Sequence, residues 1–164
     1  MSRRSKPARR IPAPDAVYNS VDIASFINRL MRRGKKSIAE KIFYSTLENM
    51  RTKTKDEPLE VFKKALTNAT PLLEVKARRI GGSTYQVPLD VKADRGMVLG
   101  STWLIEAAKK RSGKSMVEKL TNELMDASNG VGAACKKRED THIMEEANQA
   151  FAHYRYLFGI KYNE

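Results

Sequence analysis

Two histidines and one cysteine are the side chains of this chain best suited to catalysis or metal binding. His142 and His153 stand eleven residues apart in one predicted helix, roughly 16 Å along its axis, so they do not share a metal ion. Cys135 is the single cysteine, which excludes an internal disulfide and thiolate zinc sites, and it lies in no nucleophile motif. The phosphate-binding patterns GxxxxGK(S/T) and GxGxxG are absent. We therefore expect no catalytic residue, no metal and no cofactor.

Basic residues gather at the joints between predicted helices, where backbone and long side chains can meet phosphates together. The clusters are RRGKK (32–36), KARR (76–79), KKRSGK (109–114) and KKR (136–138). Neighbouring glycines allow close backbone approach, and the helix N-termini that follow attract anions. One such cluster is typical of any solvated surface, but four of them with a basic tail favour a polyanion-binding protein.

The overall charge supports the same interpretation. The chain has 31 Lys and Arg against 19 Asp and Glu, a net charge of +12, which makes nucleic acid the first candidate partner and an anionic membrane the second. Residues 1–17 combine five basic residues with three prolines and predict a basic tail. No apolar run approaches the ~20 residues of a membrane-spanning helix, and the first ten residues lack the apolar stretch of a secretory signal. We expect no membrane partner and disfavour an organellar transit peptide, because prolines interrupt the tail.

Apolar residues that recur every three or four positions predict six helices. The first runs from Asn19–Ser20 to near Gly34, the second covers 38–50, and the third opens at Asp56 and Pro58. The fourth follows Asp94, the fifth ends near Asn129–Gly130, and the sixth begins near Thr141, with 136–138 ahead of it. The core is predicted to include Phe43, Phe62, Trp103 and, with Ile143, Ala147 and Ala150 on the face of the last helix, Phe151.

Residues 73–92 have a different period. Val75, Tyr85, Val87 and Val91 alternate at period two around Gly81–Gly82, which predicts a two-stranded hairpin. Arg78 and Arg79 are neighbours and should therefore point to opposite faces of the ribbon. The uncharged tip suits close approach to a nucleic-acid strand, and equally an ordinary tight turn. The predicted fold is mainly α, one domain of six helices with a hairpin arm between the third and fourth, divided into a tail (1–17), a helical domain (18–156) and an extension (157–164).

The segment from Ser20 to Thr46 is similar to a family signature. It places Ser20, Asp22 and Phe26–Ile27 before Gly34–Lys35–Lys36, and Ile42–Phe43 before Thr46. Further segments agree in order and spacing: PLEVFKKAL (58–66), LLEVKARRIGGSTYQVPLDV (72–91), the stretch around 102–104, and KKREDTHIMEEANQAFAHYRY (136–156). On these residues the chain resembles the small-subunit ribosomal protein seven family.

The resemblance implies the same six helices and hairpin arm, and a structural rather than enzymatic role. It implies direct binding to the 3′ major domain of 16S rRNA, nucleation of the assembly of the small-subunit head, and a place near the decoding centre and the tRNA exit site. The implied partners are 16S rRNA, exit-site tRNA and small-subunit ribosomal proteins nine and eleven. The chain would be a monomer within a cytoplasmic ribosome.

By position, the resemblance assigns rRNA contacts to the tail, two loops, the hairpin and the fourth helix: Arg3, Arg4, Arg9, Arg10, Arg32, Arg33, Lys35, Lys36, Lys76, Arg78, Arg79, Arg95, Lys109, Lys110, Arg111 and Lys114. It directs the hairpin tip and the end of the last helix toward the exit site: Gly81, Gly82, Ser83, Thr84, Tyr154, Arg155 and Tyr156. The family often has arginine where this chain has Gly96 and Thr102.

The alternative hypothesis is a helical DNA-binding or architectural nucleoid protein. The same charge and the same basic hairpin would serve it through phosphate contacts and groove insertion.

Overall fold

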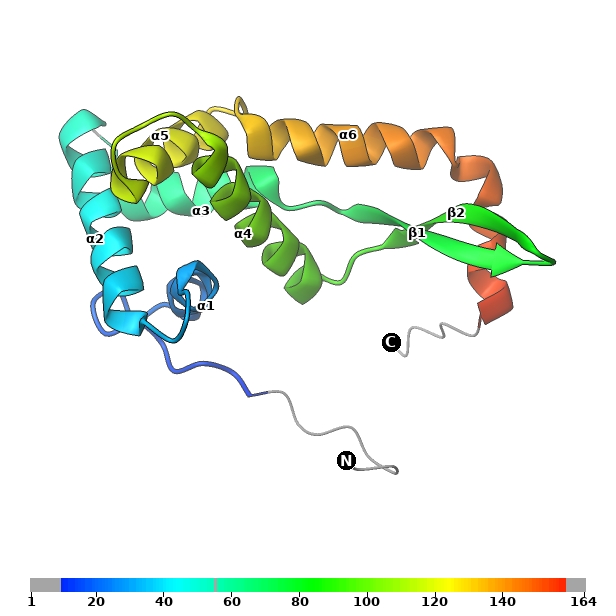
Figure 1. Cartoon of the computed structure of the whole chain (residues 1–164), viewed down its shortest axis with the longest axis horizontal. Coiled ribbons are helices and arrows are strands. Elements are labelled where there is room, and N and C mark those ends of the chain that lie inside the picture. The colour runs from blue at the N-terminus through cyan, green and yellow to red at the C-terminus, as the bar shows by residue number, and fades with distance from the viewer. Residues whose placement is uncertain (1–9, 55, 159–164) are drawn as a thin grey trace. The chain divides into compact units, whose positions relative to one another are not determined.

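The structure is a computed structural model that describes residues 10–54 and 56–158, with side chains described as far as Tyr154 (Figure 1). The chain divides into two compact units whose boundary falls between Phe43 and Tyr44. This boundary lies inside the second helix, α2 (Lys36–Lys53).

The first unit is a turn followed by α1 (Val21–Leu30) and the opening turns of α2. Asp15 begins the turn, since its carboxylate accepts hydrogen bonds from the backbone N–H groups of Val17 (3.2 Å) and Tyr18 (3.1 Å). The amphipathic period of α1 buries Ile23, Phe26, Ile27 and Leu30. Phe26 packs against Phe43 of α2 with ring centroids 5.5 Å apart.

The second unit holds the end of α2 and the remaining elements. These are α3 (Pro58–Ala69), β1 (Leu73–Ile80), β2 (Ser83–Asp90), α4 (Ala93–Lys110), α5 (Met116–Ser128), α6 (Ala133–Ala147) and a 3-10 helix, η1 (Gln149–Phe158). The predicted mainly α fold with a hairpin between the third and fourth helices is confirmed. The hydrophobic core lies where α3 and α4 pack against α5, and Phe62, Leu104, Leu120 and Leu124 have no exposed surface there.

The hairpin has the predicted turn. β1 and β2 pair antiparallel with Ile80 opposite Ser83, which leaves Gly81 and Gly82 as the two turn residues. Their φ angles are +57° and +92°, a region in which glycine meets little steric cost, as a two-residue hairpin turn requires. α6 runs alongside β1, and η1 crosses β2 (Figure 1).

The last helix differs from the prediction at both ends. α6 begins at Ala133, ahead of Thr141, so the basic residues 136–138 lie within it and not in a preceding joint. It ends at Ala147, because Asn148 adopts a non-helical cap conformation and its Nδ2 donates to Met144 O (2.6 Å). The chain then changes direction and continues as η1, which the uninterrupted apolar period did not reveal.

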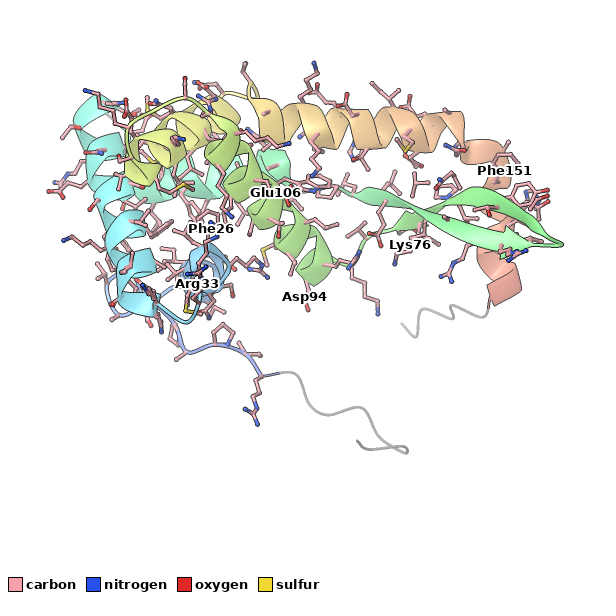
Figure 2. The ribbon with its side chains drawn as sticks, in the orientation of Figure 1. Phe26, Arg33, Lys76, Asp94, Glu106 and Phe151 are labelled. Atoms are coloured by element: carbon pink, nitrogen blue, oxygen red, sulfur yellow. The ribbon has the colours of Figure 1, made fainter. Side chains whose placement is uncertain are left out.

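The predicted core face of this helix is also wrong. Ile143, Ala147 and Ala150 are exposed. Phe151 is half-buried, and it lies on η1 against Tyr85 of the hairpin and Tyr154, with ring centroids 5.3 Å and 6.3 Å away (Figure 2). Apolar periodicity identifies an apolar face but not the element that packs against it. Here the two-stranded hairpin packs against Phe151.

The two phenylalanines should therefore differ in their contribution to stability. Phe62→Ala should lower the free energy of unfolding by ~3–5 kcal/mol, because it empties a fully buried site. Phe151→Ala should cost less than about 2 kcal/mol, since its ring is only half-buried. Urea unfolding followed by circular dichroism measures both, and equal losses would show that η1 belongs to the core.

Candidate nucleic-acid interface

The loop between α1 and α2 presents exposed cations from a tight turn. Lys35 N–H donates to Arg32 O (3.1 Å), and the two central residues, Arg33 and Gly34, both have positive φ (52° and 73°). This is the geometry of a type I′ turn. Arg33 thus adopts the left-handed backbone conformation, which is unfavourable for arginine. Arg32, Arg33, Lys35 and Lys36 are all exposed.

Three of the predicted rRNA contacts, Lys76, Arg78 and Arg79, lie on the hairpin and differ in exposure. The register places Arg78 opposite Tyr85 and Arg79 opposite Thr84, so the two arginines lie on opposite faces, as predicted. Arg79 is exposed, whereas Arg78 is half-buried on the face that also carries Tyr85. The tip from Gly81 to Thr84 is exposed along its whole length.

A carboxylate at the base of the hairpin pairs with two predicted contacts. Glu74 accepts from Lys76 Nζ at 2.8 Å and from Arg95 Nε and Nη2 at 3.0 and 2.8 Å. Burial alone would raise the pKa of Glu74, but the hydrogen bonds from Arg95 and Lys76 outweigh it and the pKa is lowered. The carboxylate therefore stays ionised, and this group of three side chains carries a net charge of +1, with Lys76 still reaching solvent (Figure 2).

Aromatic side chains connect the hairpin to η1. Tyr85 lies 5.2 Å from Tyr154, and Tyr154 lies 4.0 Å from His153, between ring centroids. The structure thus brings one member of the predicted exit-site segment beside the hairpin. The backbones of Arg155 and Tyr156 belong to η1, but their side chains lie outside the described set.

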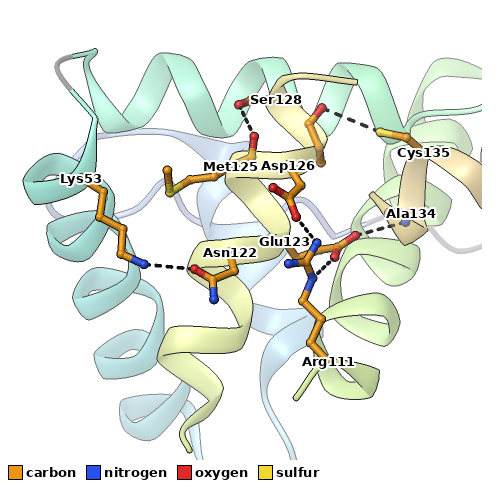
Figure 3. A network of polar contacts seen from close by, with 10 residues as sticks. Lys53, Arg111, Asn122, Glu123, Met125, Asp126, Ser128, Ala134 and Cys135 are labelled. Carbon is orange, nitrogen blue, oxygen red and sulfur yellow. Dashed lines mark hydrogen bonds and ion pairs between the residues drawn. The ribbon is translucent and has the colours of Figure 1, made fainter. Parts of the chain in front are cut away.

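The end of α4 and the loop that joins it to α5 carry two kinds of cation. Lys109 and Lys110, in the last turn of α4, and Lys114, in the loop, are exposed. Arg111 instead turns inward, where it pairs with Glu123 and Asp126 of α5 (Figure 3). Burial would lower the pKa of Arg111, but its hydrogen bonds to Asp126 and Glu123 outweigh this and raise it, so the guanidinium stays charged.

The basic residues 136–138 lie in α6, and two of them contact other helices. Lys137 pairs with Glu106 (3.0 Å) and lies 5.4 Å from the ring centroid of Trp103. Arg138 Nη1 donates to Asn68 O (2.6 Å) near the end of α3. These side chains hold α6 against α3 and α4, and only Lys136 of the three has no ion pair among the described residues.

Gly96 marks a close approach of α4 to the end of α3. A Cβ added there would lie 2.9 Å from Thr70 Cγ2 and 3.1 Å from Pro71 O. An arginine at this position, common in the resembled family, would require the two elements to separate.

Sequence patterns did not identify the acidic partners Glu74 and Glu123. Glu123 had a visible signal, because it falls three residues after Leu120 and one before Leu124, on the apolar face of α5. A charge at such a position predicts a buried ion pair. Glu74 lies two residues before Lys76 on β1, but no pattern in the sequence connects it to Arg95 of α4.

The remaining predictions concern absences and the tail. No group of three or more His, Cys, Asp or Glu side chains within 10–54 and 56–158 is arranged to hold a metal ion. In the same residues no helix is long and apolar enough to cross a membrane. Arg3, Arg4 and Arg9 lie outside the described residues, and Arg10 is exposed.

The fold and these surfaces describe a basic, mainly helical protein with exposed cations on its loops and hairpin. Comparison with known proteins specifies the class. A family model described as Ribosomal protein S7p/S5e matches residues 2–149. Proteins named small ribosomal subunit protein uS7 are similar along 95% of this chain and 100% of their own length: 53% identical in Thermosynechococcus vestitus, 56% in Acaryochloris marina and 55% in Clostridium novyi.

The chain belongs to the S7p/S5e family of ribosomal proteins, which confirms the resemblance seen in the sequence. It is a protein of the small ribosomal subunit, and its family binds rRNA and serves translation. The relatives named here are bacterial, in agreement with the predicted ribosomal location.

Arg33 offers a test of this interface through its backbone. Arg33→Asn should raise the free energy of unfolding by about 0.5–1 kcal/mol, because asparagine tolerates the left-handed conformation better. If the side chain contacts a phosphate, the same change should lower the slope of log affinity for rRNA against log salt by about 1. Urea unfolding and salt titration measure the two effects. A gain in stability with an unchanged slope would remove Arg33 from the set of contacts.

Proposed function

We propose that this protein binds the 3′ major domain of 16S rRNA directly and nucleates assembly of the head of the small subunit. The observation that carries the proposal is a set of exposed cations on the hairpin, at the end of α4 and in the loop that follows it, which form no ion pair among the described residues. Arg79, Lys110 and Lys114 are exposed, whereas Arg111 and Arg138 contact the protein. Loops and a ribbon of this kind suit the irregular shape of a folded RNA junction.

The proposed neighbours follow from the same family membership. The hairpin tip (81–84) and residues 154–156 of η1 are proposed to face the tRNA exit site near the decoding centre. Tyr85, beside the tip, packs against Tyr154. Small-subunit ribosomal proteins nine and eleven are the proposed protein neighbours, and the chain is proposed to act as a monomer in the cytoplasmic ribosome. The role is structural, and we propose no catalytic residue.

A competition assay tests this function against the alternative of a DNA-binding protein. The chain should prefer a folded fragment of the 3′ major domain over duplex DNA of equal length at matched salt, because phosphate attraction alone does not distinguish them. Filter binding with labelled rRNA and each competitor measures the preference. Equal competition by the two nucleic acids would overturn the proposal.

The hairpin arginines provide a second test. Arg78→Ala combined with Arg79→Ala should weaken rRNA binding and reduce the salt slope by about 1 to 2, with little change in stability. Lys63→Ala with Lys64→Ala removes the same charge from exposed positions on α3 and should leave the rRNA affinity and the salt slope nearly unchanged. Salt titrations of the two double variants measure the difference. If both variants lose affinity equally, the net charge of the protein, and not the hairpin arginines in particular, contributes to rRNA binding.

A further inference from the structure

Arg111 follows two exposed lysines at the end of α4 and precedes Lys114 of the α4–α5 loop, but its guanidinium points toward α5 (Figure 3). Its Nε donates to Glu123 and its Nη2 to Asp126, and its side chain is 27% exposed. One edge of the guanidinium is thus committed to two carboxylates of α5. This commitment conflicts with the expectation that Arg111 contacts rRNA.

Glu123 connects the loop to α6. Its side chain has no exposed surface, and its two oxygens divide between two elements. Oε2 accepts from Arg111, and Oε1 accepts from the backbone N–H of Ala134 (3.1 Å) in the first turn of α6. A carboxylate so deeply buried is stable only with both partners in place, so it fixes the position of Arg111 relative to α6.

The other end of the loop is held by local hydrogen bonds. Ser115 caps α5, since its Oγ accepts from Glu118 N–H (3.3 Å). The Glu118 carboxylate accepts from Lys114 N–H (3.1 Å). The loop is therefore restrained both at Arg111 and at Lys114, and between these points its backbone has little freedom.

We propose that Arg111 and Glu123 are positioning residues for RNA binding by this loop. Arg111 does not contact RNA. Together with Glu123 it fixes the loop that carries Lys114 relative to the end of α4, where Lys109 and Lys110 lie. The three lysines then meet phosphates in one arrangement, which lowers the entropy lost on binding. The inference rests on the proposed function, because it assigns the roles of residues within the same RNA-binding surface.

The sign of the effect of Glu123→Gln separates positioning from simple electrostatics. The change removes a negative charge, so electrostatics alone would tighten binding to a polyanion. Positioning predicts the opposite, an affinity about three- to tenfold weaker, in the range of couplings between contacting residues. Affinity for the rRNA fragment is measured at matched salt, at a temperature where circular dichroism shows the variant folded.

Asp126→Asn keeps the test valid if Glu123→Gln fails to fold, because the Asp126 side chain is 46% exposed and tolerates change. It too should weaken binding despite removing a negative charge. Asp140→Asn, at an exposed position on α6, is the matched control and should bind as tightly as the unchanged chain or slightly more tightly. Tighter binding by Glu123→Gln and Asp126→Asn would overturn the proposal.

The salt slope distinguishes Arg111 from a neighbouring contact. Lys110→Ala should lower the slope by about 1, as the loss of one phosphate contact does. Arg111→Gln should weaken binding with the slope unchanged, and Arg111→Lys, which keeps a donor toward the carboxylates, should restore part of the affinity. A slope that falls by about 1 in Arg111→Gln would make Arg111 a phosphate contact and overturn the proposal.

Hydrogen exchange tests the loop without RNA. The amides of Gly113 and Lys114 should exchange faster in Glu123→Gln and Asp126→Asn than in Asp140→Asn. Unchanged exchange in both network variants would overturn the positioning role. A failure of the unchanged chain to prefer rRNA would instead overturn the proposed function, and the exchange result would still decide whether this ion network restrains the loop.

Discussion

Much of the second unit depends on the hydrogen bonds that the buried carboxylate of Glu123 accepts. Removing a carboxylate from water costs several kcal/mol, and this cost is offset only where donors meet it in good geometry. Here those donors are Arg111, after α4, and the backbone N–H of Ala134, at the start of α6. One side chain of α5 therefore sets how α4 ends and where α6 begins. The direction of α6 in turn determines what lies along the hairpin.

The hairpin needs that support, because a two-stranded ribbon alone is marginally stable in water. α6 lies beside β1 and η1 beside β2, and Tyr85 of the ribbon packs against both Phe151 and Tyr154. Glu74 adds a link from the ribbon to Arg95 at the start of α4. The break at Asn148 is what makes this possible, since a straight continuation of α6 would not cross β2. The arm is thus a composite of strands and helix, with its uncharged tip exposed.

Much of this fold was predictable because it depends on local sequence. The hairpin followed from period two and two turn glycines, and α1, α3 and α5 followed from apolar spacing and from Pro58 and Asn129 near the ends of α3 and α5. The division of α6 from η1 was not predictable, because Asn148 interrupts an apolar period that continues to Tyr154. Among the site residues, the sequence alone identified only the positions of the basic clusters. It did not separate Arg111 and Arg138, which contact the protein, from exposed Lys110 and Lys114. That separation depends on acceptors far away in the sequence.

The distribution of charge over these elements has a physical logic. A chain with a net charge of +12 repels itself, so its cations must either pair or remain in water. Some cations on helices have acidic or carbonyl partners, as Lys137 has with Glu106 and Arg138 with Asn68. Others remain exposed, among them Arg33 and Lys114 on loops and Arg79 on the ribbon, and at Arg33 the backbone adopts the left-handed conformation. Repulsion among such side chains is relieved when phosphates neutralise them. Under the proposed function, these exposed cations are therefore the part of the surface that RNA would stabilise most.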